Sequence, residues 1–300
     1  MKRGDKEMLK RPPALIIGLL GLLLMVGGCG ESIREYVDYY YPNWLTDGRI
    51  MAVKVVEKER QTGIIPGYSR SEKYFHGEYI VSMKDDGSEE REIYGGEDKG
   101  INIPAASPLG NYIAYRSGQY INIISADGKS EIKSIDCGEK ASSFDWSPDE
   151  GKIVFTGDET KDMYIIDIAS NSKTKIATSA EAVAWRVGEK IVHSFADYES
   201  SKIYAIKSDG SSKEVIAAIG TDPQISNTNK VIYSGYGLQV NQVDISGNND
   251  KLLFDGYQRS SLKLSFDNNK IVGGDWIQGG YEKGVWIVNI DGSGLTKLRN

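Results

Sequence analysis

The sequence predicts an all-β fold in which residues 44–300 form one six-bladed β-propeller of four-stranded blades. Three observations lead to this prediction. A turn motif returns about every 40 residues, a second turn rich in Asp-Gly follows each copy about 20 residues later, and the segments between the turns are rich in Ile, Val and Tyr. The chain has 34 Gly and only 8 Pro, a composition that favours strands and tight turns over helices.

The N-terminal segment has the three parts of a secretory signal peptide. Five basic and two acidic residues lie within residues 1–11, residues 14–28 form the apolar run ALIIGLLGLLLMVGG, and small residues precede Cys29. A helix of this length spans about 22 Å, less than the roughly 30 Å hydrocarbon core of a membrane. We therefore expect residues 1–28 to be a cleaved signal peptide, with an uncleaved membrane anchor as the alternative.

The residues Val26-Gly27-Gly28-Cys29 resemble the lipobox of bacterial lipoproteins. In that motif an apolar residue and two small ones precede the cysteine that is lipidated and becomes the mature N-terminus. The resemblance implies that Cys29 carries the lipid, and stable anchoring takes more than one acyl chain. A chance cysteine in an ordinary signal or anchor helix is the alternative. Residues 29–43 would then be the lipidated cysteine and a tether, or contain a helical turn.

The lipobox resemblance also implies a location. The protein would be lipid-anchored to a membrane of the cell envelope and face the periplasm or the exterior. Gly30 stands where Gram-negative lipoproteins retained at the inner membrane have Asp, which points to the outer membrane in an organism that has one.

The first recurring turn precedes a strand that reads Lys or Arg followed by apolar residues. Its spacing is 41, 37, 41 and 40 residues from the second copy to the sixth, and 62 residues between the first two copies. The first strand of each unit is expected to end just before this turn. These strand ends lie near Trp44, Ala106, Trp146, Trp185, Ile225 and Leu264.

The second recurring turn is Asp-Gly in most copies. Asp-Gly between two strand-like runs is a strong hairpin signal, and we expect a two-residue turn in which both residues have positive φ. The turns are Asp86-Gly87, Asp127-Gly128, Ser170-Asn171, Asp209-Gly210, Ser246-Gly247 and Asp291-Gly292. Each unit then holds four short strands.

The second and third strands of each unit are nearly continuous apolar runs, as in MYIIDI and VWIVNI. This pattern is typical of a sheet covered on both faces, and every blade of a propeller packs between two neighbours. A linear stack would expose a sheet face at each end. We therefore expect the units to close into a ring.

The repeats, above all SPDEGKIVF with MYIIDI, resemble the propeller repeats of TolB and of the prolyl-oligopeptidase group. The resemblance covers about residues 44–300. TolB carries an α/β domain before its propeller, where this sequence has only residues 30–43, and the peptidases carry a hydrolase domain that is not seen here. The resemblance therefore implies a fold and very little function.

The sequence shows no catalytic constellation, so we expect a protein that is not an enzyme. A Gly-x-Ser-x-Gly nucleophile elbow is absent. His193 lies on a strand as a packing residue, His76 lies in an insertion without a second histidine, and Cys137 is interpreted as a loop or core thiol. In the other copies the position of His193 is Ala52, Ala114, Phe155, Tyr233 or Gly273.

No metal or cofactor site is expected. The Asp-Gly turns lack the D-x-[DN]-x-[DN]-G pattern of calcium loops, no Cys/His cluster suits zinc, and no glycine-rich phosphate loop precedes a helix. Some sugar-acid lyases with TolB-like propellers hold a metal with several histidines. The two histidines of this chain cannot rebuild such a site.

One large insertion, over residues 57–77, accounts for the 62-residue spacing. It connects the second and third strands of the first unit, and such loops project from the rim opposite the Asp-Gly turns. Exposed aromatic residues with arginine are typical of binding hot spots, so we expect this rim to bind a partner. A disordered loop with aromatics folded between the blades is the alternative. The candidate residues are Tyr68, Arg70, Tyr74, Phe75, His76, Arg116, Tyr198, Tyr236, Trp276 and Tyr281.

The favoured function is binding, as an envelope adaptor or receptor for a protein, a peptide or a glycan, with a lipid membrane contacted through acylated Cys29. An envelope polysaccharide lyase or hydrolase on a propeller scaffold is the alternative, and a structural part of a larger envelope machine is a third hypothesis. Net charge is −6 although the N-terminal segment is basic, so the remainder is acidic. Nucleic-acid binding is not expected, because it needs a basic face.

Overall fold

The computed structural model describes residues 31–65, 68–196, 201–235, 239–256, 260–277 and 281–300. The chain divides into two compact units. One comprises Met1–Glu35 and Lys58–Tyr74, and the other comprises Tyr36–Glu57 and Phe75–Asn300. The predicted signal peptide and Cys29 lie outside the described residues. No helix in the described ranges is long and apolar enough to cross a membrane.

Four sheets each contain four consecutive antiparallel strands. The first has β5 (Asn102–Ala106), β6 (Tyr112–Ser117), β7 (Tyr120–Ser125) and β8 (Glu131–Asp136). The second has β9 (Ala141–Trp146), β10 (Lys152–Gly157), β11 (Met163–Asp167) and β12 (Lys173–Ala177). The third has β13 (Val183–Ala184), β14 (Lys190–Ala196), β15 (Ser201–Lys207) and β16 (Glu214–Ala217). The fourth has β17 (Thr221–Ile225), β18 (Lys230–Ser234), β19 (Val240–Asp244) and β20 (Lys251–Phe254).

An eight-stranded sheet contains the first and last sets of four strands. The first set is β1 (Glu31–Trp44), β2 (Ile50–Ile65), β3 (Tyr68–Met83) and β4 (Arg91–Gly96). The last set is β21 (Ser260–Leu264), β22 (Lys270–Ile277), β23 (Tyr281–Asn289) and β24 (Thr296–Arg299). The two sets join where Tyr40 of β1 pairs with Lys283 of β23. Repeated four-stranded antiparallel sheets confirm the predicted all-β, propeller-type fold.

The Asp-Gly hairpins lie where the sequence predicts them, but their geometry differs from the expectation. Gly87 and Gly128 have φ of +79° and +72°, whereas the preceding aspartates are not in the left-handed region. Each aspartate instead accepts a backbone N–H from two residues later, as Asp86 does from Ser88 at 2.8 Å. The expectation that both turn residues need positive φ was therefore wrong, because an Asx hydrogen bond already fixes the first position.

Two segments predicted as irregular are strands. Residues 31–44 form β1 rather than a tether or a helical turn. The segment is rich in Tyr, Ile and Val, and alternate side chains at Val37 and Tyr39 pack into an apolar cluster, which favours a strand. The 57–77 insertion lies in β2 and β3, which extend to residues 65 and 68 as paired neighbours, rather than in a loop.

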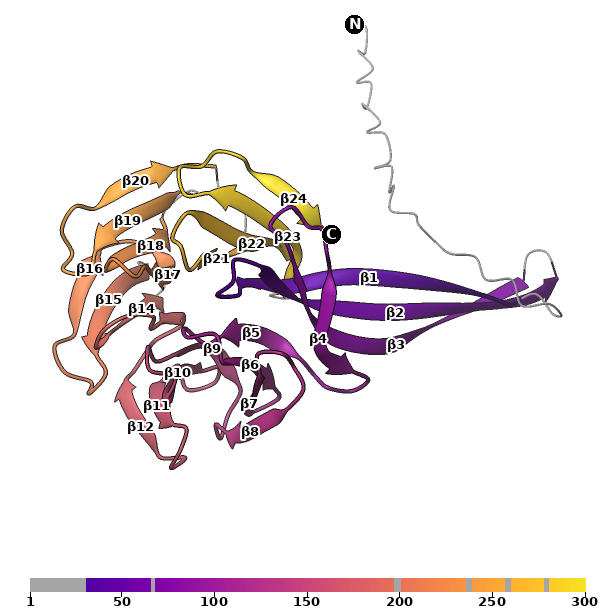
Figure 1. Cartoon of the computed structure of the whole chain (residues 1–300), viewed down its shortest axis with the longest axis horizontal. Helices are drawn as coiled ribbons and strands as arrows, with labels where there is room; N and C mark the ends of the chain where they lie inside the picture. Colours follow the sequence, from indigo (N-terminus) through magenta and orange to yellow (C-terminus); the bar gives the residue numbers. More distant parts are fainter. Residues whose placement is uncertain (1–30, 66–67, 197–200, 236–238, 257–259, 278–280) are drawn as a thin grey trace, which may run out of the picture. The chain divides into compact units, whose positions relative to one another are not determined.

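The core of the larger unit lies between successive sets of strands. One apolar cluster joins β5–β8 to β9–β12, and other clusters join each later set to the next. A cluster containing Trp44, Val81, Val272 and Val285 joins the first set to the last, and a further one joins the first set to β5–β8. Figure 1 shows the sheets of this unit following one another around a centre. The predicted ring closure is therefore present.

Candidate functional site: a charged cavity lined by the first strands

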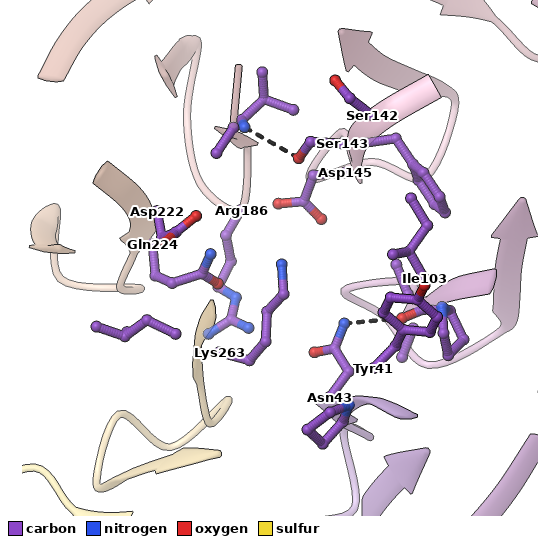
Figure 2. A pocket seen from close by; sticks show the side chains of 18 of the residues that line it. Tyr41, Asn43, Ile103, Ser142, Ser143, Asp145, Arg186, Asp222, Gln224 and Lys263 are labelled. Atoms are coloured by element: carbon purple, nitrogen blue, oxygen red, sulfur yellow. Dashed lines mark hydrogen bonds between the residues drawn. The ribbon is translucent and has the colours of Figure 1, made fainter. Parts of the chain in front are cut away.

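A cavity of about 280 Å³ lies in the larger unit (Figure 2). Most of its walls come from the first strand of each set, namely β1, β5, β9, β13, β17 and β21, or from residues next to them. Its charged side chains are Asp145, Glu181, Arg186, Asp222 and Lys263. Charges of both signs therefore face one small space.

Strand alternation explains which residues line the cavity. In β1, β9, β17 and β21 the residue just before the end of the strand faces the cavity, while the last residue points into the sheet interface. Asp145 and Lys263 line the cavity, whereas Trp146 and Leu264 are 0% and 1% exposed. The cavity-lining residues at this position are Asn43, Ala105, Asp145, Gln224 and Lys263. The position that recurs in the repeats, from Trp44 to Leu264, is the next residue, so this set lies one residue before it in the sequence.

The buried tryptophans bind adjacent sets together beside the cavity. The indole N–H of Trp44 donates to the carbonyl oxygen of Lys263 at 2.9 Å, which links the first set to the last. The indole N–H of Trp146 donates to the carbonyl oxygen of Ala105 at 3.1 Å. The cavity wall is thus held by hydrogen bonds between sheets as well as by apolar packing.

The wall is also bent at three points. Tyr41, Ile103 and Asp222 have φ of +51°, +39° and +48°, and each precedes a proline. The pairing register shifts at Asn102–Ala105 and Thr221–Gln224, so extra residues bulge from β5 and β17. Left-handed φ at such residues costs on the order of 1–3 kcal/mol each, and strain of this kind concentrates at functional sites.

The half-buried side chain of Asp145 links two sets of strands. Its Oδ1 accepts the backbone N–H of Trp146 at 2.9 Å, and its Oδ2 accepts that of Trp185 at 2.8 Å. Burial raises the pKa of Asp145, while the Trp185 N–H and the charges of Lys263 and Arg186 oppose the rise. Both carboxylate oxygens already have donors, so this side chain fixes the wall.

Arg186 is also held by the protein. Its guanidinium donates to the carbonyl oxygens of Ser265 and Leu264 at 3.1 and 3.0 Å, and lies 4.2 Å from the centroid of the Phe266 ring. Burial lowers the pKa of Arg186, and the charge of Asp145 opposes this. The arginine therefore joins the end of β13 to β21, two sets further along the chain.

Asp222 and Lys263 are less constrained. Burial raises the pKa of Asp222, and the charge of Lys263 opposes that rise. The hydroxyl of Thr221 is a hydrogen-bond partner of the Asp222 carboxylate. Within the described ranges, no ion pair involves Asp222 or Lys263, and the Lys263 ammonium makes no hydrogen bond. In Figure 2 both side chains point into the cavity.

Of the ten predicted rim residues, the structure describes the side chains of Tyr74, Phe75, His76 and Arg116, and none of these four lines the cavity. Tyr74 and Phe75 are exposed, at 37% and 42%, and His76 lies 3.9 Å from the carboxylate of Glu97. Tyr68 and Arg70 lie on β3, Trp276 on β22 and Tyr281 on β23, but their side chains lie outside the described part. Tyr198 and Tyr236 lie outside the described residues altogether. The rim as a binding surface stays a prediction.

Arg116 corrects the rim prediction at one position. It is 8% exposed, and its Nη1 donates to the carbonyl oxygen of Ala141 at 2.7 Å. The guanidinium thus reaches from β6 to the first residue of β9 between packed sheets. A side chain buried in this way does not lie on an exposed rim.

His193 and Cys137 are core residues, as predicted. Both are 0% exposed. The ring of His193 stacks on Tyr204 with centroids 5.3 Å apart, and burial, with a smaller effect of Lys213, lowers its pKa to about 4. Burial raises the pKa of the Cys137 thiol to about 12. Neither residue reaches the cavity.

The sequence matches no protein-family model, and a search of curated proteins found no match. Solved structures do resemble it. TolB from Acinetobacter baumannii has a TM-score of 0.60 at 14% identity, with 90% of this chain and 80% of that chain covered. An oligogalacturonate lyase from Vibrio parahaemolyticus has a TM-score of 0.56 at 12% identity, with 93% and 86% covered. These likenesses support a TolB-like propeller fold.

An oligogalacturonate lyase in complex with manganese is also similar, with a TM-score of 0.56 at 12% identity over 94% of this chain and 84% of that one. The cavity residues do not fit such a metal. Both oxygens of Asp145 accept backbone N–H groups, and cationic Arg186 and Lys263 share the space. The described residues include no group of three or more His, Cys, Asp or Glu placed to hold a metal.

Proposed function

We propose that this protein is a binding module of the cell envelope, a six-bladed propeller that takes its ligand in the central cavity. The blade count is supported by the apolar clusters, one between each pair of consecutive four-stranded sets and one that closes the ring. On this interpretation the eight-stranded sheet is two blades joined by the β1–β23 pair.

The observation that supports binding is the pair Asp222 and Lys263, which face one cavity without ion pairs in the described chain. A charged group removed from water costs free energy unless a partner compensates it. A bound ligand would supply the partners that the protein itself does not. A rigid cavity wall favours ligand binding, because it is already ordered before the ligand arrives. Three residues with left-handed φ and two tryptophan hydrogen bonds between sheets hold this wall.

An envelope polysaccharide lyase or hydrolase is the second candidate. It is supported by the two carboxylates of Asp145 and Asp222, whose pKa values burial raises, since perturbed carboxylates are typical of acid and base catalysts. Asp145 weakens this candidate because two backbone N–H groups hold it in place. Of the other carboxylates that line the cavity, Glu181 is exposed and Asp222 is half-buried, so Asp222 has no second half-buried, unconstrained carboxylate beside it for a two-carboxylate mechanism.

The location follows from the N-terminal segment. We infer that Cys29 is lipidated and holds the propeller on an envelope membrane. Labelled palmitate should be incorporated by cells that express the natural chain and not by cells that express Cys29→Ser. Equal labelling of the two would refute the lipid anchor and leave the cavity proposal untouched.

The cavity proposal is tested by filling the cavity. Gln224 lines it, whereas Gln119 is exposed on another set of strands, so Gln224→Trp and Gln119→Trp form a matched pair. Each protein would be mixed with an envelope extract, separated from free small molecules by gel filtration, and unfolded. Mass spectrometry should find a released ligand with the natural chain and Gln119→Trp only.

Two outcomes would change the conclusion. Equal release from Gln224→Trp would place the ligand elsewhere on the protein. Chemical conversion of a glycan by the natural chain, abolished in Asp222→Asn, would establish the enzyme in place of the binding module.

A further inference from the structure

The charged side chains of the cavity differ in whether the protein supplies them with hydrogen-bond or ion-pair partners. Asp145 has two backbone N–H donors, and Arg186 has two carbonyl acceptors and an aromatic ring. These two charges need nothing from a ligand. Asp222 has only the hydroxyl of Thr221, and the Lys263 ammonium has no hydrogen-bond or ion-pair partner among the described residues. Glu181, the fifth charged side chain of the cavity, is exposed to solvent. The half-buried charges without an ion-pair partner in the described chain are therefore one anion and one cation.

The two unsatisfied groups lie on adjacent elements. Asp222 is on β17 and Lys263 on β21, and these first strands of successive sets pack against each other. The Lys263 charge influences both Asp222 and Asp145, so the ammonium lies near these carboxylates but beyond ion-pair distance. Figure 2 shows the three side chains directed into the same space.

This arrangement discriminates among ligand charges. An anion would meet Lys263 but be repelled by Asp222, and a simple cation would meet Asp222 but be repelled by Lys263. A ligand that carries an ammonium and a carboxylate a few bonds apart would satisfy both. Such a ligand would also leave neither of these two half-buried charges unpaired.

Size and wall chemistry restrict the ligand further. A cavity of about 280 Å³ is at the small end of the range for ligand pockets, roughly 300–1,000 Å³. Part of its wall is apolar, from Ile103, Phe144 and Leu262. It therefore suits a small zwitterion with an apolar or uncharged side chain better than a chain of sugars or residues.

We propose that the cavity binds a free α-amino acid, with its ammonium group at Asp222 and its carboxylate at Lys263. This inference rests on the proposed function, since it takes the cavity as the ligand site. In a peptide the two charged termini are separated, so only the free amino acid presents both charges together.

The test uses the full-length protein in detergent and the twenty common L-amino acids as probes. Thermal melting would identify the amino acids that stabilise the protein, and calorimetric titration would give their dissociation constants. The best binder would be compared with its N-acetyl derivative and its amide, each of which lacks one charge. We expect both derivatives to bind roughly 10- to 100-fold more weakly, since a hydrogen bond to a charged group is worth about 1.5–3 kcal/mol.

Variants give an independent measurement. Asp222→Asn and Lys263→Gln should each weaken binding roughly 10- to 100-fold. Asn tolerates the positive φ at position 222, so the first change preserves the backbone. The matched controls are Asp255→Asn and Lys140→Gln, at exposed positions outside the cavity, and they should bind as the natural chain does.

The outcomes separate this inference from the proposed function. Equal affinity for the amino acid and its two derivatives would refute zwitterion recognition even if a variant failed to fold. Absence of amino-acid binding, with an extract ligand still lost in Gln224→Trp, would refute the ligand class and retain the binding module. Absence of both effects would overturn both.

Discussion

The substitution His193→Phe is expected to make the protein more resistant to mild acid. His193 lies on β14 with no exposed surface, its Nδ1 is 3.2 Å from the carbonyl oxygen of Ser194, and its Nε2 has no hydrogen-bond partner among the described residues. Phe155 holds the same position in the preceding unit, with its ring stacked on Tyr164 at 5.2 Å. A phenylalanine therefore fits a site of this shape.

The magnitude follows from the two pKa values of His193. Burial lowers the pKa from 6.5 to about 4 in the folded protein. Between these pH values the unfolded chain binds a proton that the folded chain does not, so stability decreases as the pH falls. The contribution is fully present above about pH 6.5 and is lost progressively toward pH 4. From pH 7.5 to pH 5.0 the loss is about 2 kcal/mol.

Urea unfolding of the natural chain and of His193→Phe at both pH values measures this loss. Carboxylates titrate in the same range, but their effect cancels in the difference between the two proteins. The reciprocal variant Phe155→His should lose about 2 kcal/mol more stability on acidification than the natural chain, since it adds a second histidine in an equivalent buried position. An unchanged pH dependence in His193→Phe would refute the burial of a neutral imidazole.

Three further predictions concern ring closure and the core. Trp44→Phe removes the hydrogen bond to Lys263 and should lower the free energy of unfolding by about 1–3 kcal/mol in urea titrations, and an unchanged midpoint would show that this bond contributes nothing. Deleting residues 262–300 removes most of β21 and all of β22–β24, so calorimetry should show no cooperative melting, and a sharp transition would contradict the closed ring. Cys137, with its pKa raised to about 12, should resist iodoacetamide at pH 8 until denaturant is added, and mass spectrometry of the native protein would reveal any earlier alkylation.

The repeats predicted the strands because each turn has a local cause. Gly128 occupies a left-handed position, and Asp127 accepts a hydrogen bond from the backbone N–H of Lys129 at 3.2 Å. Such preferences act within a few residues and are visible in the sequence. Residues 31–44 lacked a turn signal of this kind, and their strand depends on pairing with β2 and on burial of Tyr39.

The cavity was harder to predict for a different reason. Its residues come from segments about 40 positions apart. Asp222 and Lys263, the two charges on which the proposed ligand depends, are therefore far apart in the sequence. Lys263 stands alone between apolar residues and looks like any strand lysine. The 57–77 insertion and its aromatic residues are a stronger local signal, and they favoured the rim as the predicted binding surface. Comparing the six copies one position earlier would have shown Asp145 and Lys263 but not Asp222.

Lys263 contributes both to the fold and to the cavity. Its backbone carbonyl oxygen accepts a hydrogen bond from the Trp44 indole N–H, and its side chain lines the cavity. The residue stands within the last forty of the chain, and Trp44 stands near the beginning. A nascent chain that ends before Lys263 lacks this residue, so this part of the cavity wall forms only after most of the propeller has been synthesised. A molecule truncated before Lys263 would lack one of the two charges on which the proposed ligand depends. Occupation of the site would in turn report that the whole ring has closed.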